Sequence, residues 1–351
     1  MSESARARLM SADTIAAGGP AAKSLLHWPE RGSVFAERQM RLRQLAQGHA
    51  MADFLRFMAE LARAQHKALQ QSPDVPLPDR PALERADRAG LPVIPAADWP
   101  RDAAWREALR AIAKDLRGAD IPEGVRAALD ALDRMNDDAL ERQADCLLTG
   151  VMHGLDLAAA PLVAAALQVY WTRLALGVQA LVEADAGAAA QTDGLGRLSV
   201  RIHDPGACPC CGSRPTASLT RSTGAASGQR FLHCSLCSVQ WPLPRIQCAY
   251  CMASERIFYQ SLDAIDASAE ESSARAAQAA VQAECCEDCG HYLKIMHRDR
   301  DGFVEPVADD LATITLDLLV SEAGLQRHGV NLMLLFGDSE AVPGTVPSGG
   351  S

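Results

Sequence analysis

Four cysteine pairs with two intervening residues lie within 82 residues of this sequence. They are Cys208/Cys211, Cys234/Cys237, Cys248/Cys251 and Cys286/Cys289. A thiolate-bound metal ion takes four sulfurs in a tetrahedron, and the two-residue spacing lets one tight turn present two sulfurs to the same ion. The four pairs therefore predict two complete four-cysteine sites. Pairing along the sequence closes shorter loops than crossed pairing, which favours a first site from the first two pairs and a second from the last two.

The residues alone leave the metal open, because four thiolates suit zinc and a rubredoxin-type iron equally well. Cys210 and Cys285 lie beside ligand candidates but outside the two-residue spacing, and we expect them to be spare thiols. Cys146 lies among apolar residues of an expected helix and is predicted to be an inert core thiol. The sites have a purely structural alternative, since four-cysteine modules often stabilise small β folds that cannot bury a sufficient core.

The elements that must position these cysteines differ between the two halves of the chain. Around the cysteines, short β-branched or aromatic runs interrupted by Gly and Pro predict strands, at 230–233, 239–242, 257–262 and 292–297. Upstream, apolar residues recur with helical periodicity, and a proline-rich connector occupies 72–100. In the last long helix of that region, from about 161 to 186, Trp171 is expected to lie off the apolar stripe. A further helix is predicted over 308–324.

These patterns predict a multidomain α+β protein. An N-terminal α-helical bundle is followed by two small rubredoxin-like or zinc-ribbon metal modules, each with four cysteine ligands, and a C-terminal helix. The expected divisions are a flexible segment at 1–33, the helical domain at 34–188, a linker at 189–198, the metal modules at 199–245 and 246–304, and the C-terminal helix and tail at 305–351.

Composition and charge narrow the possible roles. The 351 residues carry a formal net charge of −10, and residues 199–300 hold ten Lys and Arg against ten Asp and Glu. Because phosphate binding depends on an excess of cations, this balance disfavours a nucleic-acid-binding zinc ribbon. The N-terminus shows no signal-peptide pattern, and the longest uncharged run, 157–172, is too short to span a bilayer. Thiols kept free for metal are consistent with a cytoplasmic protein without membrane insertion.

Several segments resemble a known family when they are taken together and in order. They are FAERQMRLRQLAQGH (35–49), ADFLRFMAELARAQ (52–65), ALQVYWTRLA (166–175), CPCCGSRP (208–215), RFLHCSLC (230–237), the pair at 248–251, CEDCGHYLKI (286–295) and EPVADDLATITLDLL (305–319). This combination resembles the formate dehydrogenase accessory proteins, the FdhE family, over most of residues 34–330.

The resemblance implies a cytoplasmic, non-catalytic assembly factor. Such a protein is needed for active respiratory formate dehydrogenase and binds its catalytic subunit before export, and it carries rubredoxin-like iron sites on the eight paired cysteines. Iron is therefore preferred at the two sites, with zinc as the alternative, and self-association is possible. The sequence shows no Ser-His-Asp set and no phosphate-binding glycine loop. A rubredoxin-like electron-transfer protein is the second hypothesis, and a nucleic-acid-binding zinc ribbon is the third.

Overall fold

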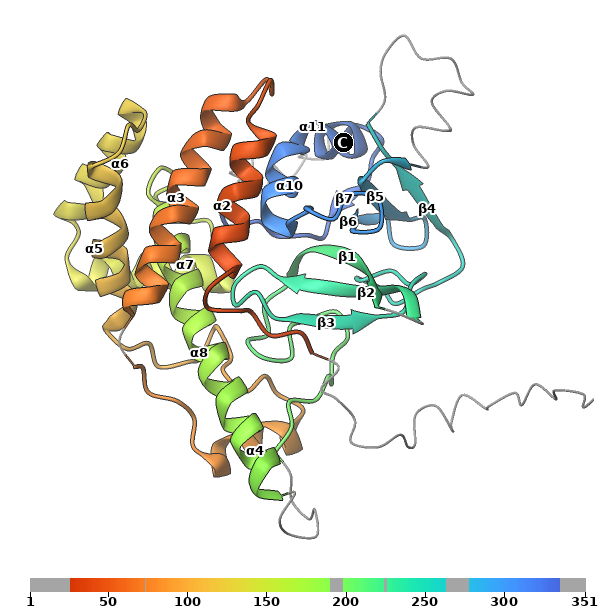
Figure 1. Ribbon diagram of the computed structural model, residues 1–351, viewed down its shortest axis with the longest axis horizontal. Helices are drawn as coiled ribbons and strands as arrows, with labels where there is room; N and C mark the ends of the chain where they lie inside the picture. Colours follow the sequence, from red (N-terminus) through yellow and green to blue (C-terminus); the bar gives the residue numbers. More distant parts are fainter. Residues whose placement is uncertain (1–25, 73, 190–197, 224–225, 263–277, 335–351) are drawn as a thin grey trace, which may run out of the picture.

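The computed structural model describes residues 26–334, except for residue 73 and the segments 190–197, 224–225 and 263–277 (Figure 1). Most of the segment expected at 1–33, nearly all of the linker expected at 189–198 and the tail after residue 334 lie outside the described residues.

The N-terminal half is built of α-helices. They are α2 (Val34–Leu45), α3 (Ala52–Gln71), α4 (Arg80–Ala89), α5 (Ala104–Arg117), α6 (Glu123–Arg134), α7 (Asp137–Thr149) and α8 (Ala160–Ala189). Local signals fix several helix ends. The side chains of Asp79 and Asn136 accept hydrogen bonds from the first-turn N–H groups of α4 and α7, and Gly90 and Gly150 end these helices with left-handed backbone.

Helix α8 is the central element of this half. Its segment Ala160–Gly187 is long and apolar enough to cross a membrane, yet 83% of its most apolar window is buried inside the protein. Helices α3, α5 and α7 pack against it. The expectation that Trp171 lies off the apolar stripe is wrong, because this side chain is fully buried and its indole N–H donates to the carbonyl of Ile94 at 3.3 Å. A helix covered on several sides buries more than one stripe.

The C-terminal half contains a single seven-stranded sheet with the order β3-β2-β1-β6-β5-β4, and β7 pairs with β6 (Figure 1). The strands are β1 (Pro215–Thr223), β2 (Ala226–Cys234), β3 (Gln240–Leu243), β4 (Ile257–Gln260), β5 (Val281–Cys286), β6 (His291–His297) and β7 (Gln326–Arg327). The predicted helical half followed by two four-cysteine modules is confirmed. The strands of the two modules, however, join in one sheet, through the parallel pairing of Ser218–Thr220 in β1 with Ile295–His297 in β6.

Two short helices, α10 (Pro306–Ala312) and α11 (Ile314–Glu322), occupy the region where one helix was predicted. Thr313 separates them, because its φ of −113° and ψ of 33° are not helical and its hydroxyl donates to the carbonyl of Asp309. Helix α10 packs against both α2 and β1, so it lies between the two halves of the molecule.

One continuous apolar core crosses the boundary between the halves. It contains Leu42 and Leu167 from the helices, Leu236 and Trp241 from the first metal module, and Leu311 from α10. The helical half and the first metal module therefore share a core.

Candidate metal centres

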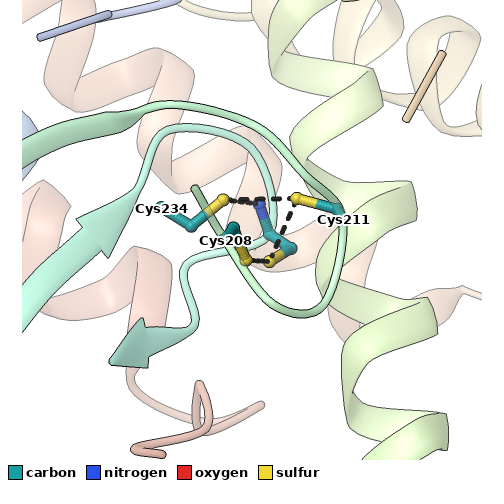
Figure 2. Close-up of side chains that lie close together, drawn as sticks. Cys208, Cys211 and Cys234 are labelled. Atoms are coloured by element: carbon teal, nitrogen blue, oxygen red, sulfur yellow. Dashed lines mark hydrogen bonds between the residues drawn. The ribbon is translucent and has the colours of Figure 1, made fainter. Parts of the chain in front are cut away.

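The first centre consists of the sulfurs of the two pairs Cys208/Cys211 and Cys234/Cys237, which all lie within 4.8 Å of one another. Figure 2 shows the labelled sulfurs of Cys208, Cys211 and Cys234 facing one another from the turn before β1 and the end of β2. The Sγ–Sγ distances are 3.5 Å for Cys208–Cys237 and 3.4 Å for Cys211–Cys234. All four side chains are buried, none more than 1% exposed.

The second centre consists of Cys248/Cys251 and Cys286/Cys289, also within 4.8 Å of one another. Its Sγ–Sγ distances are 3.7 Å for Cys248–Cys289 and for Cys251–Cys286. Here Cys251 is exposed and Cys289 is partly exposed. The two groups thus combine the pairs in sequence order, as the sequence analysis expected.

The sulfur spacing fits a tetrahedral metal ion in both groups. A tetrahedron with metal–sulfur bonds of about 2.3 Å has sulfur–sulfur edges of about 3.8 Å. The two distances given for the second group match this value, and the two given for the first are shorter by about a tenth. Disulfide sulfurs lie about 2.05 Å apart, and all eleven cysteines are free thiols. The two groups can therefore bind two metal ions, and the donor set suits iron and zinc alike.

All four cysteine turns share one backbone feature. The residue after the second cysteine of each pair adopts a positive φ: 78° at Gly212, 60° at Ser238, 63° at Met252 and 68° at Gly290. In two of the pairs, backbone N–H groups of the turn also lie near the first sulfur. The N–H groups of Leu236 and Cys237 lie 3.4 Å from the sulfur of Cys234, and that of Tyr250 lies 3.4 Å from the sulfur of Cys248. Such bonds stabilise thiolate charge.

Burial also sets the protonation of the first group. It raises the pKa of Cys208 and Cys237 above the ordinary thiol value, whereas hydrogen bonds from neighbouring thiols overcome burial and lower the pKa of Cys211. Four adjacent thiols cannot all ionise to thiolates in a buried site without a cation to balance their charge. Metal binding must therefore displace protons from these sulfurs, which makes the affinity depend on pH.

The helical half holds both turns of the first centre. The N–H groups of Ile94 and Ala96 donate to the carbonyls of Cys210 and Cys211, each at 2.9 Å. On the other turn, the side-chain amide of Gln168 in α8 donates to the carbonyl of Ser235 at 2.7 Å. The proline-rich connector therefore binds one turn of the first centre through its backbone, and α8 binds the other turn through a side chain.

The remaining cysteines and histidines of this region lie outside the two sulfur groups. Cys285 is buried in β5, and burial raises its pKa to about 12. Cys210 is buried beside the first centre, and Cys146 is a partly buried thiol. Neither group includes a histidine. His233 is a buried strand residue, and Trp241 is part of the local core.

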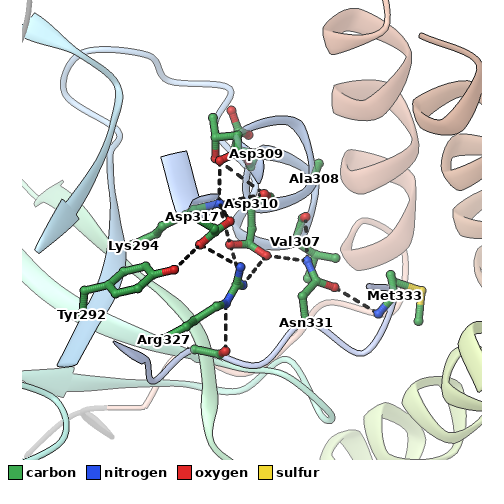
Figure 3. A network of polar contacts seen from close by, with 12 residues as sticks. Tyr292, Lys294, Val307, Ala308, Asp309, Asp310, Asp317, Arg327, Asn331 and Met333 are labelled. Atoms are coloured by element: carbon green, nitrogen blue, oxygen red, sulfur yellow. Dashed lines mark hydrogen bonds and ion pairs between the residues drawn. The ribbon is translucent and has the colours of Figure 1, made fainter. Parts of the chain in front are cut away.

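Sequence reasoning missed a cluster of buried charges beside the sheet. Lys294 in β6 contacts Asp317 of α11 at 2.5 Å and Asp310 of α10 at 3.2 Å. Arg327 donates to both carboxylate oxygens of Asp310, and the hydroxyl of Tyr292 donates to Asp317 (Figure 3). Asp309 and Asp310 lie at the start of α10, where acidic residues are common even on exposed helices. Their occurrence in an otherwise apolar segment was the available signal that they are paired and buried.

Comparisons with known proteins connect this geometry to a family. Three family models cover nearly the whole described chain: "FdhE, N-terminal" at residues 23–186, "FdhE, central domain" at 207–245 and "FdhE, C-terminal domain" at 246–334. The chain belongs to the FdhE family. The cysteines of the first centre fall in the central FdhE domain and those of the second in the C-terminal FdhE domain.

Relatives of known sequence and structure agree with this assignment. An FdhE homologue of Serratia proteamaculans is 35% identical over 305 residues, which cover 87% of this chain and 89% of that protein. The homologue of Yersinia enterocolitica is 35% identical over 306 residues, with the same coverage. The crystal structure of the FdhE protein from Pseudomonas aeruginosa matches with a TM-score of 0.72 at 35% identity and covers 88% of this chain and 98% of that one.

Proposed function

We propose that this FdhE-family protein is a cytoplasmic accessory factor for respiratory formate dehydrogenase. It binds the catalytic subunit of that enzyme before export and turns over no small substrate itself. Family membership along almost the whole described chain supports this proposal, together with two intact four-cysteine groups.

The metal centres give the protein a defined surface for a partner. Both turns of the first centre are fastened to the helical half, through Ile94, Ala96 and Gln168. Loss of the ion would release four buried thiols in the shared core, so the relative position of the two halves depends on the metal. We propose iron as the native ion at both centres, with zinc able to occupy the same sulfurs.

The test is complementation of a deletion strain. Restored respiratory formate dehydrogenase activity, and co-purification of the catalytic subunit with the tagged protein, are the expected results. A strain that keeps full activity without this gene, with no capture of the subunit, contradicts the proposal. A role as a one-electron carrier is the second candidate, favoured by the exposed Cys251 at the second centre. It requires that iron restores activity and zinc does not, whereas an accessory factor with structural metals accepts both.

A further inference from the structure

The two centres differ sharply in their access to solvent. In the first, all four cysteines and the residues between Cys234 and Cys237 are buried. In the second, Cys251 is exposed, the adjacent Tyr250 is 53% exposed, and Glu287 and Asp288 form an exposed turn between the other two sulfurs. A solute can therefore reach Cys251 while the protein stays folded, although Cys248 and Cys286 are buried.

The centres also differ in what must move before a sulfur can leave. At the first centre the carbonyls of Cys210, Cys211 and Ser235 accept hydrogen bonds from the helical half. Opening either turn breaks these bonds and pulls the first metal module away from the core that it shares with the helical half. Release of a sulfur therefore requires partial unfolding of both parts.

The turns of the second centre are bonded within the C-terminal half. The turn of Cys248 and Cys251 is closed by short-range bonds, and the N–H of Glu287 in the other turn donates to the carbonyl of Arg256 at 3.0 Å. The N–H of Cys248 donates to Ala253 at 2.8 Å, and the N–H of Met252 donates back to Cys248 at 3.1 Å. Met252 follows Cys251 with a φ of 63°, a left-handed conformation that costs a residue with a side chain about 1–2 kcal/mol. Ser238 adopts the same conformation at the first centre, so this strain does not distinguish the two centres; what distinguishes the turn of Cys251 is its exposure and its local bonding.

We propose that the second centre is an exchangeable metal site, whereas the first holds its ion until the protein unfolds. In the exchange step, Cys251 is the sulfur that leaves. A soluble thiolate or chelator donates a lone pair to the ion as the bond from Cys251 breaks, and the freed thiolate takes a proton from water. No electron is transferred, and the other three cysteines follow in the same way. This proposal depends on both cysteine groups binding metal. It does not depend on the proposed role in formate dehydrogenase maturation.

The test is the kinetics of metal release from the full-length zinc-loaded protein. Two zinc ions per chain are first verified by metal analysis, and an excess of 4-(2-pyridylazo)resorcinol is then added. We expect one equivalent to leave at least tenfold faster than the other. The fast rate should rise with chelator concentration, because the chelator attacks the ion directly. The slow rate should be independent of chelator, because opening of the protein limits it.

Thiol labelling assigns the phases without any mutation. Thiols that are accessible in the loaded protein, such as Cys146, are first blocked with N-ethylmaleimide. Iodoacetamide is then added after the fast phase, and peptides are mapped. We expect the new label on the cysteines of the second centre, which are Cys248, Cys251, Cys286 and Cys289.

Two variants complete the assignment. Cys251→Ser should remove the fast equivalent and leave the slow one, and Cys285→Ser, which changes a buried thiol next to the site, should leave both phases unchanged. Release of both ions at one rate, first labelling of the Cys208–Cys237 group, or fewer than two ions per chain would each overturn the inference. Because no formate dehydrogenase is present in the assay, these outcomes are independent of complementation.

Discussion

The ion pair between Arg38 in α2 and Glu305 before α10 lies across the boundary of the two halves. Arg38 Nε lies 3.1 Å from Glu305 Oε1, and the two side chains are 1% and 8% exposed. The second carboxylate oxygen of Glu305 accepts from the N–H of Ala308 and so caps α10. The change Glu305→Gln removes the charge and keeps an oxygen for the cap, so it isolates the ion pair.

The expected cost is large because the partner is left charged in the core. Removal of one member of a buried ion pair typically costs about 3–5 kcal/mol, since the remaining charge has lost both water and its counter-ion. Replacement of both members with Arg38→Met and Glu305→Gln removes that penalty. The double variant should therefore lose less stability than the sum of the two single variants, by about 0.5–3 kcal/mol.

The assay is urea unfolding followed by tryptophan fluorescence, with metal content verified to be equal in all variants. Buried tryptophans report on both halves, Trp171 from the helices and Trp241 from the sheet. The control is Asp53→Asn, which breaks an ion pair with Arg56 whose side chains are 94% and 62% exposed. Its effect should be negligible, because exposed pairs are screened by solvent. If Glu305→Gln costs no more than this control, or if the single effects add, the pair does not hold the two halves together.

Three further outcomes are expected. Cys286→Ser should lose one metal ion per chain while Cys285→Ser keeps both, as metal analysis will show; an empty second centre in Cys285→Ser would reverse this assignment. Gly290→Ala should cost about 1–2 kcal/mol in urea unfolding through its φ of 68° alone, because an added Cβ meets no atom within 4 Å; a neutral result would mean that the turn relaxes. Burial lowers the pKa of His297 from 6.5 to about 4, so the unfolded chain takes up a proton between these values that the folded protein refuses. Stability should therefore fall as pH drops through that window, and His297 contributes at most about 1.4 kcal/mol per pH unit to this fall. His297→Gln should reduce the slope by that share, while His328, whose pKa is also lowered to about 4 by burial, keeps the remainder; an unchanged slope would contradict the assignment.

The metal groups could be predicted from sequence because ligand spacing is a local property. A Cys-x-x-Cys turn places its two sulfurs by itself, and the choice of Cys286 over Cys285 followed from spacing alone. The helices of the N-terminal half could also be predicted from sequence, because apolar periodicity and caps such as Asn136 are local signals.

The joining of the two modules could not be predicted in this way. The parallel pairing of Ser218 with Ile295 links residues far apart in the sequence, and no local pattern specifies a partner strand. The buried charges were missed for a related reason. Asp309 is a reasonable first-turn acid on a surface helix, and only the position of Arg41 on another element shows that it is buried and paired.

The contacts between Arg38 and Glu305 join residues 267 positions apart, and those between Arg41 and Asp309 join residues 268 apart. At a synthesis rate of about 5–20 residues per second, α2 waits roughly 13–54 s on the ribosome for these partners. During that time the helical half has emerged, but its surface for α10 is uncovered. We therefore expect a chain released before residue 301 to expose this surface to chaperones and proteases, and limited proteolysis of such truncated chains should cut within α2, where the full-length protein resists.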